Sequence, residues 1–240
     1  MKIPAMADSV STPPPLRGIS SMATRQLLAE LTRAWQARSG QSVALESVGG
    51  VDAAKRVQAG EAFDLVVLAS DAIDKLMAAG CLEPGSKVDL VRSGTSVAVP
   101  AGAPLPDISS ENAVRAAVLA APTLGYSTGP SGVALAKLFE RWGIAEQVKD
   151  RIVTPPPGTP VGALIARGEV ALGFQQLSEL IHVLGITVVG PLPEAIAIDT
   201  VFSAAVCKGT SRADDLRALL AFMASSETTP AKRAQGMQAL

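Results

Sequence analysis

The stretch "FDLVVLAS", residues 63–70, decides the fold. Its unbroken apolar run is typical of a strand that is buried on both faces of a parallel sheet. The preceding segment, residues 51–62, has the pattern of a helix, and the following segment, residues 71–85, reads as a helix that Gly80 and Pro84 terminate. A buried strand between two helices predicts a layered α/β protein.

The same alternation extends toward the N-terminus. "LRGISS" (16–21) reads as a strand, "MATRQLLAELTRAWQARSG" (22–40) as a helix with leucines and Trp35 at helical spacing, and "SVALESVGG" (42–50) as a second strand. Strands that alternate strictly with helices predict a mostly parallel sheet.

The second half repeats α/β units after a shift in pattern. Residues 87–104 contain two strand-like runs with little helix between them. The segments that follow are predicted to be a helix at 108–122, a strand, glycine-rich loop, helix and strand at 124–153, a helix and strand at 160–176, a strand at 200–210, and a helix at 211–235 whose apolar face holds Leu216, Leu219, Leu220 and Met223.

Composition excludes several classes of function. The chain has 240 residues, 48% of them hydrophobic and 18% charged, which is typical of a globular protein with a sizeable core. Its 21 basic and 22 acidic residues show no basic block, so nucleic acid is not expected as a partner. Cys81 and Cys207 lack metal-like spacing and His182 is the single histidine, so we expect no metal and no cofactor.

The first residues give an expectation about location. Residues 1–15 read as a flexible leader, and Asp8, Ser9 and three prolines interrupt any apolar run that could serve as a secretory signal. As written, the chain is expected in the cytoplasm, or in the periplasm if a signal was removed. No apolar run reaches the ~18 residues that a membrane-spanning helix needs, so no membrane insertion is expected.

The strongest local signal for a ligand is the loop within "YSTGPSGVALAKLF", residues 126–139. Small residues precede an apolar-periodic helix there: Ser127, Thr128, Gly129, Ser131 and Gly132. Free backbone N–H groups and hydroxyls at the positive end of a helix dipole suit an anion. The alternative is an ordinary strand-to-helix turn, in which glycine gives room and serine caps the helix.

Two other turns have a similar composition. Ser20 and Ser21 end the first strand, and Gly49 and Gly50 end the second. Three such turns, each before a helix, could surround one small oxyanion without a buried lysine or arginine. Arg25 is the cation that would meet a carboxylate if the first turn lines the pocket, and otherwise an exposed surface charge.

"GFQQLSEL", residues 173–180, marks a further strand end. Open α/β folds bind ligands where a strand end faces a helix start, so Gln175 and Gln176 are candidates for a ligand pocket. The alternative is a solvated turn with a helix cap from Ser178.

No residue stands out as a catalytic base. Glu179 and His182 follow the two glutamines and are the candidates. Each has a structural alternative: Glu179 as an acid in the first turn of a helix, and His182 as a partly buried residue of that helix. The pattern G-x-S-x-G, which would indicate a serine nucleophile, does not occur.

In their order along the chain, these segments resemble the type II periplasmic binding proteins, in the branch of the molybdate-binding proteins of ABC transporters. The stretches that carry the resemblance run from about residue 16 to 240 and include "GEAFDLVVLAS" and "RGEVALGF". The resemblance implies a two-lobed α/β fold with two crossover strands and the ligand in the cleft. Lobe one would comprise residues 16–97 and 201–240, and lobe two residues 98–200, with the turns named above and the strand end at Gln175 and Gln176 facing the cleft.

The sequence departs from the molybdate pattern at two turns. It has "VGGV" where molybdate binders tend to have a hydroxyl, and Gln175-Gln176 where they tend to have a valine-tyrosine type pair. Amides suit an organic ligand better than a bare oxyanion. We therefore expect a binding protein for a small anion, an organic carboxylate rather than molybdate, with an ABC transporter membrane component as the partner that the resemblance allows. The alternative is a cofactor-free isomerase of an unsaturated carboxylate such as aconitate, and the sequence leaves the choice between binder and enzyme open.

Overall fold

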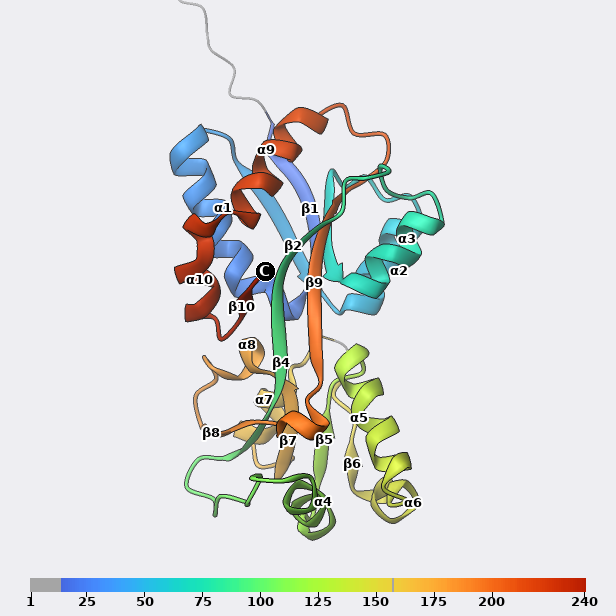
Figure 1. The fold of residues 1–240 in the computed structure, drawn as a ribbon, viewed down its shortest axis with the longest axis vertical. Coiled ribbons are helices and arrows are strands. Elements are labelled where there is room, and N and C mark those ends of the chain that lie inside the picture. The colour runs from blue at the N-terminus through green and yellow to red at the C-terminus, as the bar shows by residue number, and fades with distance from the viewer. Residues whose placement is uncertain (1–13, 157) are drawn as a thin grey trace, which may run out of the picture.

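The chain forms two α/β lobes that follow one another along the long axis of the molecule, as Figure 1 shows. The computed structural model describes residues 14–156 and 158–240. The predicted leader, residues 1–15, lies outside this part except for Pro14 and Pro15. The predicted two-lobed α/β fold is confirmed.

The first lobe contains a sheet in the strand order β2-β1-β3-β9-β4. β1 pairs in parallel with β2 and β3, whereas β9 pairs antiparallel with β3 and β4, so the sheet is mixed. All five residues of β3 are buried, as its apolar run predicts. The strands are β1 (Leu16–Ser21), β2 (Val43–Val48), β3 (Leu65–Ala69), β4 (Val88–Pro100), β9 (Asp199–Val206) and the short β10 (Gln238–Ala239), which pairs with β4.

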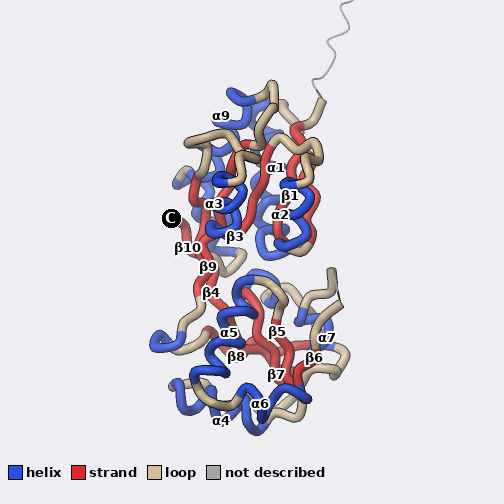
Figure 2. Tube along the Cα trace, turned by 90° about the vertical axis from the view of Figure 1, so that its right-hand side faces the viewer, coloured by secondary structure: helices blue, strands red, loops and turns tan. Residues whose placement is uncertain are grey.

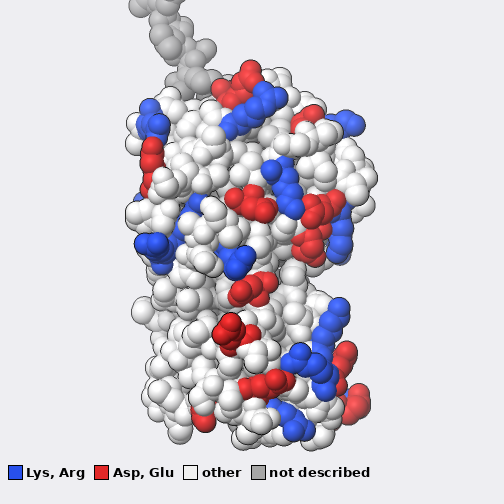
Figure 3. Space-filling view, viewed as in Figure 1, with Lys and Arg blue, Asp and Glu red and all other residues white. Residues whose placement is uncertain are grey.

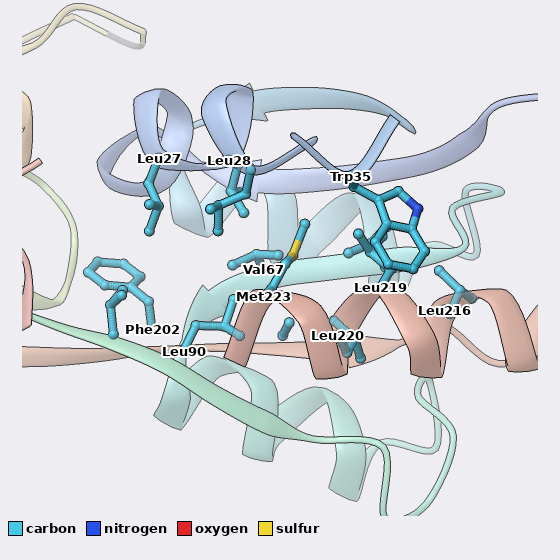
Figure 4. Close-up of a cluster of buried hydrophobic side chains, with 14 of the residues drawn as sticks. Leu27, Leu28, Trp35, Val67, Leu90, Phe202, Leu216, Leu219, Leu220 and Met223 are labelled. Atoms are coloured by element: carbon cyan, nitrogen blue, oxygen red, sulfur yellow. The ribbon is translucent and has the colours of Figure 1, made fainter. Parts of the chain in front are cut away.

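Helices cover both faces of this sheet, with α1, α9 and α10 on one face and α2 and α3 on the other (Figure 1). Figure 4 shows the core under α1 and α9, where Leu27, Leu28 and Trp35 meet the buried side of α9. The four residues predicted to form the apolar face of the last long helix are all buried, which confirms that prediction. The helices are α1 (Arg25–Ser39), α2 (Gly50–Gln58), α3 (Ser70–Ala78), α9 (Ala213–Ala224) and α10 (Thr229–Ala234).

The second lobe has its own sheet, in the order β4-β7-β5-β6, with β8 paired to β4. β5 is parallel to β6 and β7, and β4 is antiparallel to β7 and β8. Its core contains Phe139 and Phe174, whose rings meet edge to face. The elements are α4 (Glu111–Ala120), β5 (Leu124–Tyr126), α5 (Pro130–Arg141), α6 (Ala145–Val148), β6 (Ile152–Val153), α7 (Val161–Ala166), β7 (Leu172–Gln176), α8 (Leu177–Leu180) and β8 (Ile186–Pro191), and short 3-10 helices lie at Met22–Thr24, Lys149–Arg151, Glu194–Ile196 and Ser226–Thr228.

β4 and β9 connect the two lobes, as Figure 2 shows. The two strand-like runs expected within residues 87–104 are in fact one strand of 13 residues. It pairs with β9 as far as Gly94 and with β7 from Thr95 onward, because the strand passes from one sheet to the other at that point. The lobe boundaries after residues 97 and 200 remain a prediction, and the change of partner lies within a few residues of the first of them.

Charges of both signs are intermixed over the face shown in Figure 3. Many are paired, as Arg56 is with Glu46 and Glu61, at 2.6 Å in each case. Among the residues that the structure describes, no helix combines the length and the apolar character that crossing a membrane requires.

Candidate functional site

A cavity of about 750 Å³ lies between the lobes and is lined by both. The first lobe contributes the ends of β1 and β3 and the starts of α2 and α3, and the second contributes the starts of α5, α7 and α8 with the loop before α7. Thr200 and Phe202 of the crossover strand β9 complete the lining. This volume is within the range of small-molecule sites.

Helix starts that carry no side-chain cap converge on this cavity. The N-cap residues of α2, α3 and α5 are Gly49, Ala69 and Gly129, none of which has a side chain that can accept a hydrogen bond from the helix. By contrast, Ser110 caps α4 away from the cavity and accepts from the N–H of Ala113. The first N–H groups of an uncapped helix are free for a ligand, and the helix dipole favours negative charge there. The cavity is therefore suited to anionic groups.

The loop before α5 brings most of its predicted residues to the cavity. Ser127, Thr128, Gly129 and Ser131 line it, and the hydroxyls of Ser127 and Ser131 are 3.0 Å apart. Gly132 does not line the cavity but sets the shape of the loop, because a Cβ there would lie 1.6 Å from the carbonyl oxygen of Ser127. The glycine is required by close backbone packing, not by a contact with a ligand.

The two turns of lobe one also contain both residues that line the cavity and residues that do not. Ser21, Gly49 and Gly50 line the cavity. Ser20 lies behind them, fully buried, with its hydroxyl 2.8 Å from that of Ser47 on the neighbouring strand. Arg25 is exposed and is not part of the lining, so the structure gives it the surface position that the sequence had offered as the alternative.

The two glutamines line the cavity, but their amides bind other parts of the protein. Gln175 is 3% exposed, and its Oε1 accepts from the N–H of Gly162, 3.2 Å away, at the start of α7. Its Nε2 donates to Oε1 of Glu179 at 2.8 Å. The alternative of a solvated turn capped by Ser178 is wrong, because the buried Ser178 hydroxyl has no hydrogen-bond partner in the described part of the chain.

The amide of Gln176 joins the two crossover strands. In the orientation that satisfies its hydrogen bonds, Nε2 donates to the carbonyl and hydroxyl oxygens of Ser93, both at 2.9 Å, and Oε1 accepts from the hydroxyl of Thr200 at 2.8 Å. Ser93 is on β4 and Thr200 on β9, and the two residues pair across the sheet. Gln176 thus holds the end of β7 to the point where the chain crosses between lobes.

Glu179 is the carboxyl group inside the cavity with an altered acidity. Its half-buried side chain lies in the first turn of α8, beside Gln175. Burial raises the pKa of Glu179 to about 7, and the hydrogen bond from Gln175 opposes that shift in pKa. A carboxyl group with a pKa near 7 can take up and release a proton at neutral pH, which is the requirement for general acid–base chemistry.

His182, the other candidate base, lies outside the cavity lining. The predicted helix around it ends at Leu180, so His182 sits in the following turn. Its Nε2 is 2.8 Å from Oε1 of Gln235, which precedes β10. His182 is exposed in this turn, so the alternative of a partly buried residue within the helix is also wrong.

Several lining residues had no signal in the sequence. Thr200 and Phe202 reach the cavity only because β9 is shared between the lobes, and Leu68 because it lies next to the end of the buried strand β3. Lys55 and Lys75 lie on the rim, and Lys75 is 3.6 Å from Asp71. In the described ranges no group of three or more His, Cys, Asp or Glu side chains could hold a metal ion.

Comparisons with known proteins agree with this geometry. A curated relative, the aconitate isomerase of a Pseudomonas species, is 39% identical over 186 residues, which cover 76% of this chain and 70% of the relative. The periplasmic molybdate-binding protein of Azotobacter vinelandii superposes with a TM-score of 0.78 over 92% of this chain and 98% of that one, at 18% identity. The sulfate-binding protein SubI of Mycobacterium tuberculosis superposes with a TM-score of 0.76 over 94% and 86% of the two chains, at 15% identity.

Because their identities are low, these two structural likenesses establish the fold alone, which this chain shares with a molybdate-binding and a sulfate-binding protein. The family model described as bacterial extracellular solute-binding protein matches residues 16–238, which includes both lobes and every residue of the cavity lining. The chain belongs to the bacterial extracellular solute-binding proteins.

Proposed function

We propose that this protein binds a small unsaturated organic carboxylate in the cavity and isomerises it by moving a proton, with Glu179 as the base. The observation that carries the proposal is a carboxyl group with a pKa of about 7 inside a cavity that uncapped helix starts surround. The sequence alone favoured a binder, because it could not place either candidate base, Glu179 or His182, at the cleft. Glu179, a base inside the cavity, leads us to rank the isomerase above the binder.

The proposed reaction needs no cofactor. In aconitate a CH₂ group and a CH group flank the carbon between them, and the double bond joins that carbon to the CH group. Glu179 takes a proton from the CH₂ carbon, and the electron pair of the broken C–H bond spreads over the three carbons and their carboxylates. Glu179 then returns the proton to the carbon of the former CH group, so the double bond and the CH₂ group exchange places and Glu179 regains its charge. N–H donors at the helix starts stabilise the negative charge as it develops.

The lining supports an organic ligand over a bare oxyanion. Leu68, Phe202 and Val161 give the cavity an apolar part, and its volume of about 750 Å³ far exceeds the needs of a tetrahedral anion. Apolar walls with a few polar groups are typical of sites for organic molecules. The name of the aconitate isomerase relative at 39% identity points to the same class of ligand.

Proton NMR tests the isomerase directly. The protein is incubated with trans-aconitate and, separately, with cis-aconitate, and the signals of both isomers are followed. We expect conversion by the wild type, a loss of about 100-fold or more in Glu179→Gln, as is typical for removing a general base, and unchanged turnover in Glu140→Gln, an exposed control on α5. Turnover of wild-type size in Glu179→Gln, or none in the wild type, contradicts the proposal.

The second candidate is a binding protein without turnover, which membership of the solute-binding family favours. It would deliver the carboxylate to an ABC transporter membrane component, and would work in the periplasm. A thermal-shift series with aconitate, citrate, molybdate and tungstate tests the ligand class, since a ligand at 100 times its Kd stabilises by about 2.7 kcal/mol. Stabilisation by aconitate with no isomer formed supports this candidate, and stabilisation by molybdate and tungstate alone rejects the carboxylate class for both.

A further inference from the structure

The two oxygens of Glu179 have different surroundings. Oε1 accepts the 2.8 Å hydrogen bond from Nε2 of Gln175. Oε2 has no hydrogen-bond partner in the described part of the chain, and it is not among the unpartnered atoms that are buried. Because Glu179 lines the cavity, Oε2 is the oxygen that is open to it.

The amide of Gln175 is held in this orientation from its other end. Its Oε1 accepts from the buried N–H of Gly162, which is a donor only, so Nε2 must be the atom that faces Glu179. Gly162 is itself fixed by close packing, since a Cβ there would lie 3.0 Å from Cγ2 of Val183 and 3.4 Å from Cδ2 of Leu180. The start of α7 therefore sets the direction of the Gln175 amide, and that amide selects one oxygen of Glu179.

We propose that Gln175 is a positioning residue, which leaves Oε2 of Glu179 as the single oxygen that takes the proton from the substrate and returns it. This inference rests on the proposed isomerase function. The two carbons that exchange the proton are about 2.5 Å apart from ordinary bond lengths and angles. One fixed oxygen can reach both, so no second base is required on the opposite face of the substrate.

Gln175→Met is the variant that separates positioning from packing. Methionine keeps the length and volume of glutamine and removes the amide. Because the Gln175 hydrogen bond stabilises the charged carboxylate, its loss should raise the pKa of Glu179 further. We expect the midpoint of the pH profile of kcat/KM to rise by about one unit, with about fivefold lower activity at pH 7 that recovers near pH 9.

Gln176→Met is the matched control, because that amide holds the crossover strands and does not contact Glu179. It should lower the melting temperature without moving the pH midpoint. A second measurement does not depend on turnover: carbon NMR titration of protein with ¹³C-labelled glutamate, in which the Glu179 signal is identified by its absence in Glu179→Gln.

The outcomes separate the two proposals. An upward shift of both midpoints in Gln175→Met, with neither shifted in Gln176→Met, supports the positioning role. A kcat that falls equally at every pH, with an unshifted carboxyl titration, overturns it and leaves Gln175 as a packing residue. If Gln175→Met shifts the titration but the wild type converts no aconitate, the isomerase function is overturned, while the contact between the two side chains stands.

Discussion

Replacing Glu179 with Gln should stabilise the protein, and the gain should depend on pH. The pKa of Glu179 is raised from 4.5 to about 7 by burial, so between these values the folded protein holds a proton that the unfolded chain releases. Stability is therefore highest below about pH 4.5 and falls as the pH rises to 7. With 1.36 kcal/mol for each pKa unit, the loss approaches about 3 kcal/mol, an upper value because the side chain is only half-buried.

Urea unfolding followed by circular dichroism at pH 5 and pH 8 measures this effect. Glutamine can still accept the hydrogen bond from Gln175 through its carbonyl oxygen, so the variant removes the titration and keeps the contact. We expect Glu179→Gln to be more stable than the wild type at pH 8 by about 1–3 kcal/mol, with most of the difference gone at pH 5. Glu140→Gln should match the wild type at both pH values. A gain that is equal at pH 5 and pH 8, or no gain at pH 8, would refute a buried carboxyl with a raised pKa.

Four other substitutions test the cavity and the core. Gly132→Ala should destabilise the protein by about 2 kcal/mol or more in urea unfolding, because the new Cβ would lie 1.6 Å from a carbonyl oxygen. Gly129→Ala should be nearly neutral, because its Cβ would lie 3.8 Å from its nearest neighbour. Equal losses in the two variants would contradict the packing argument. Lys232→Met should raise the free energy of unfolding by about 1–3 kcal/mol, because the buried Nζ has no hydrogen-bond partner in the described chain and burial lowers the pKa of this lysine. A less stable variant would show that the ammonium group has a partner. Ser127→Ala should weaken aconitate binding about tenfold in calorimetry, with little change in melting temperature. The substitution removes a hydroxyl that lies at the cavity, 3.0 Å from the hydroxyl of Ser131. An unchanged Kd would show that Ser127 is not part of the site.

Local sequence patterns were sufficient for most of the fold. The apolar run at residues 63–70 and the helical spacing in α9 are signals that neighbouring residues create, and both elements formed within the predicted ranges, although the helix predicted at 211–235 is divided into α9, a 3-10 turn and α10. The strand–turn–helix pattern also brought Ser21, Gly50 and Ser131 to one cavity, because in each lobe these turns follow strand ends that face the other lobe.

The remaining features depend on contacts between distant segments. β4 looked like two strands because its partners change at Thr95, and only the assembled sheets reveal a continuous strand. Apart from Glu179, the partners of Gln175 and Gln176 come from α7, β4 and β9, which no local pattern connects. The acidity of Glu179 follows from desolvation by the folded chain, so a sequence could name the residue but not its pKa.

The sharing of β9 between the lobes also determines the order in which the protein can be completed during synthesis. β9 lies between β3 and β4 in the sheet of the first lobe, yet it begins at Asp199, after all of β5 to β8. On the ribosome, β1 to β3 must therefore wait with an open sheet edge while the segments of the second lobe emerge and fold. The N-terminal lobe is thus the last to close, and a chain that stops before residue 199 would expose the edge of β3 to aggregation.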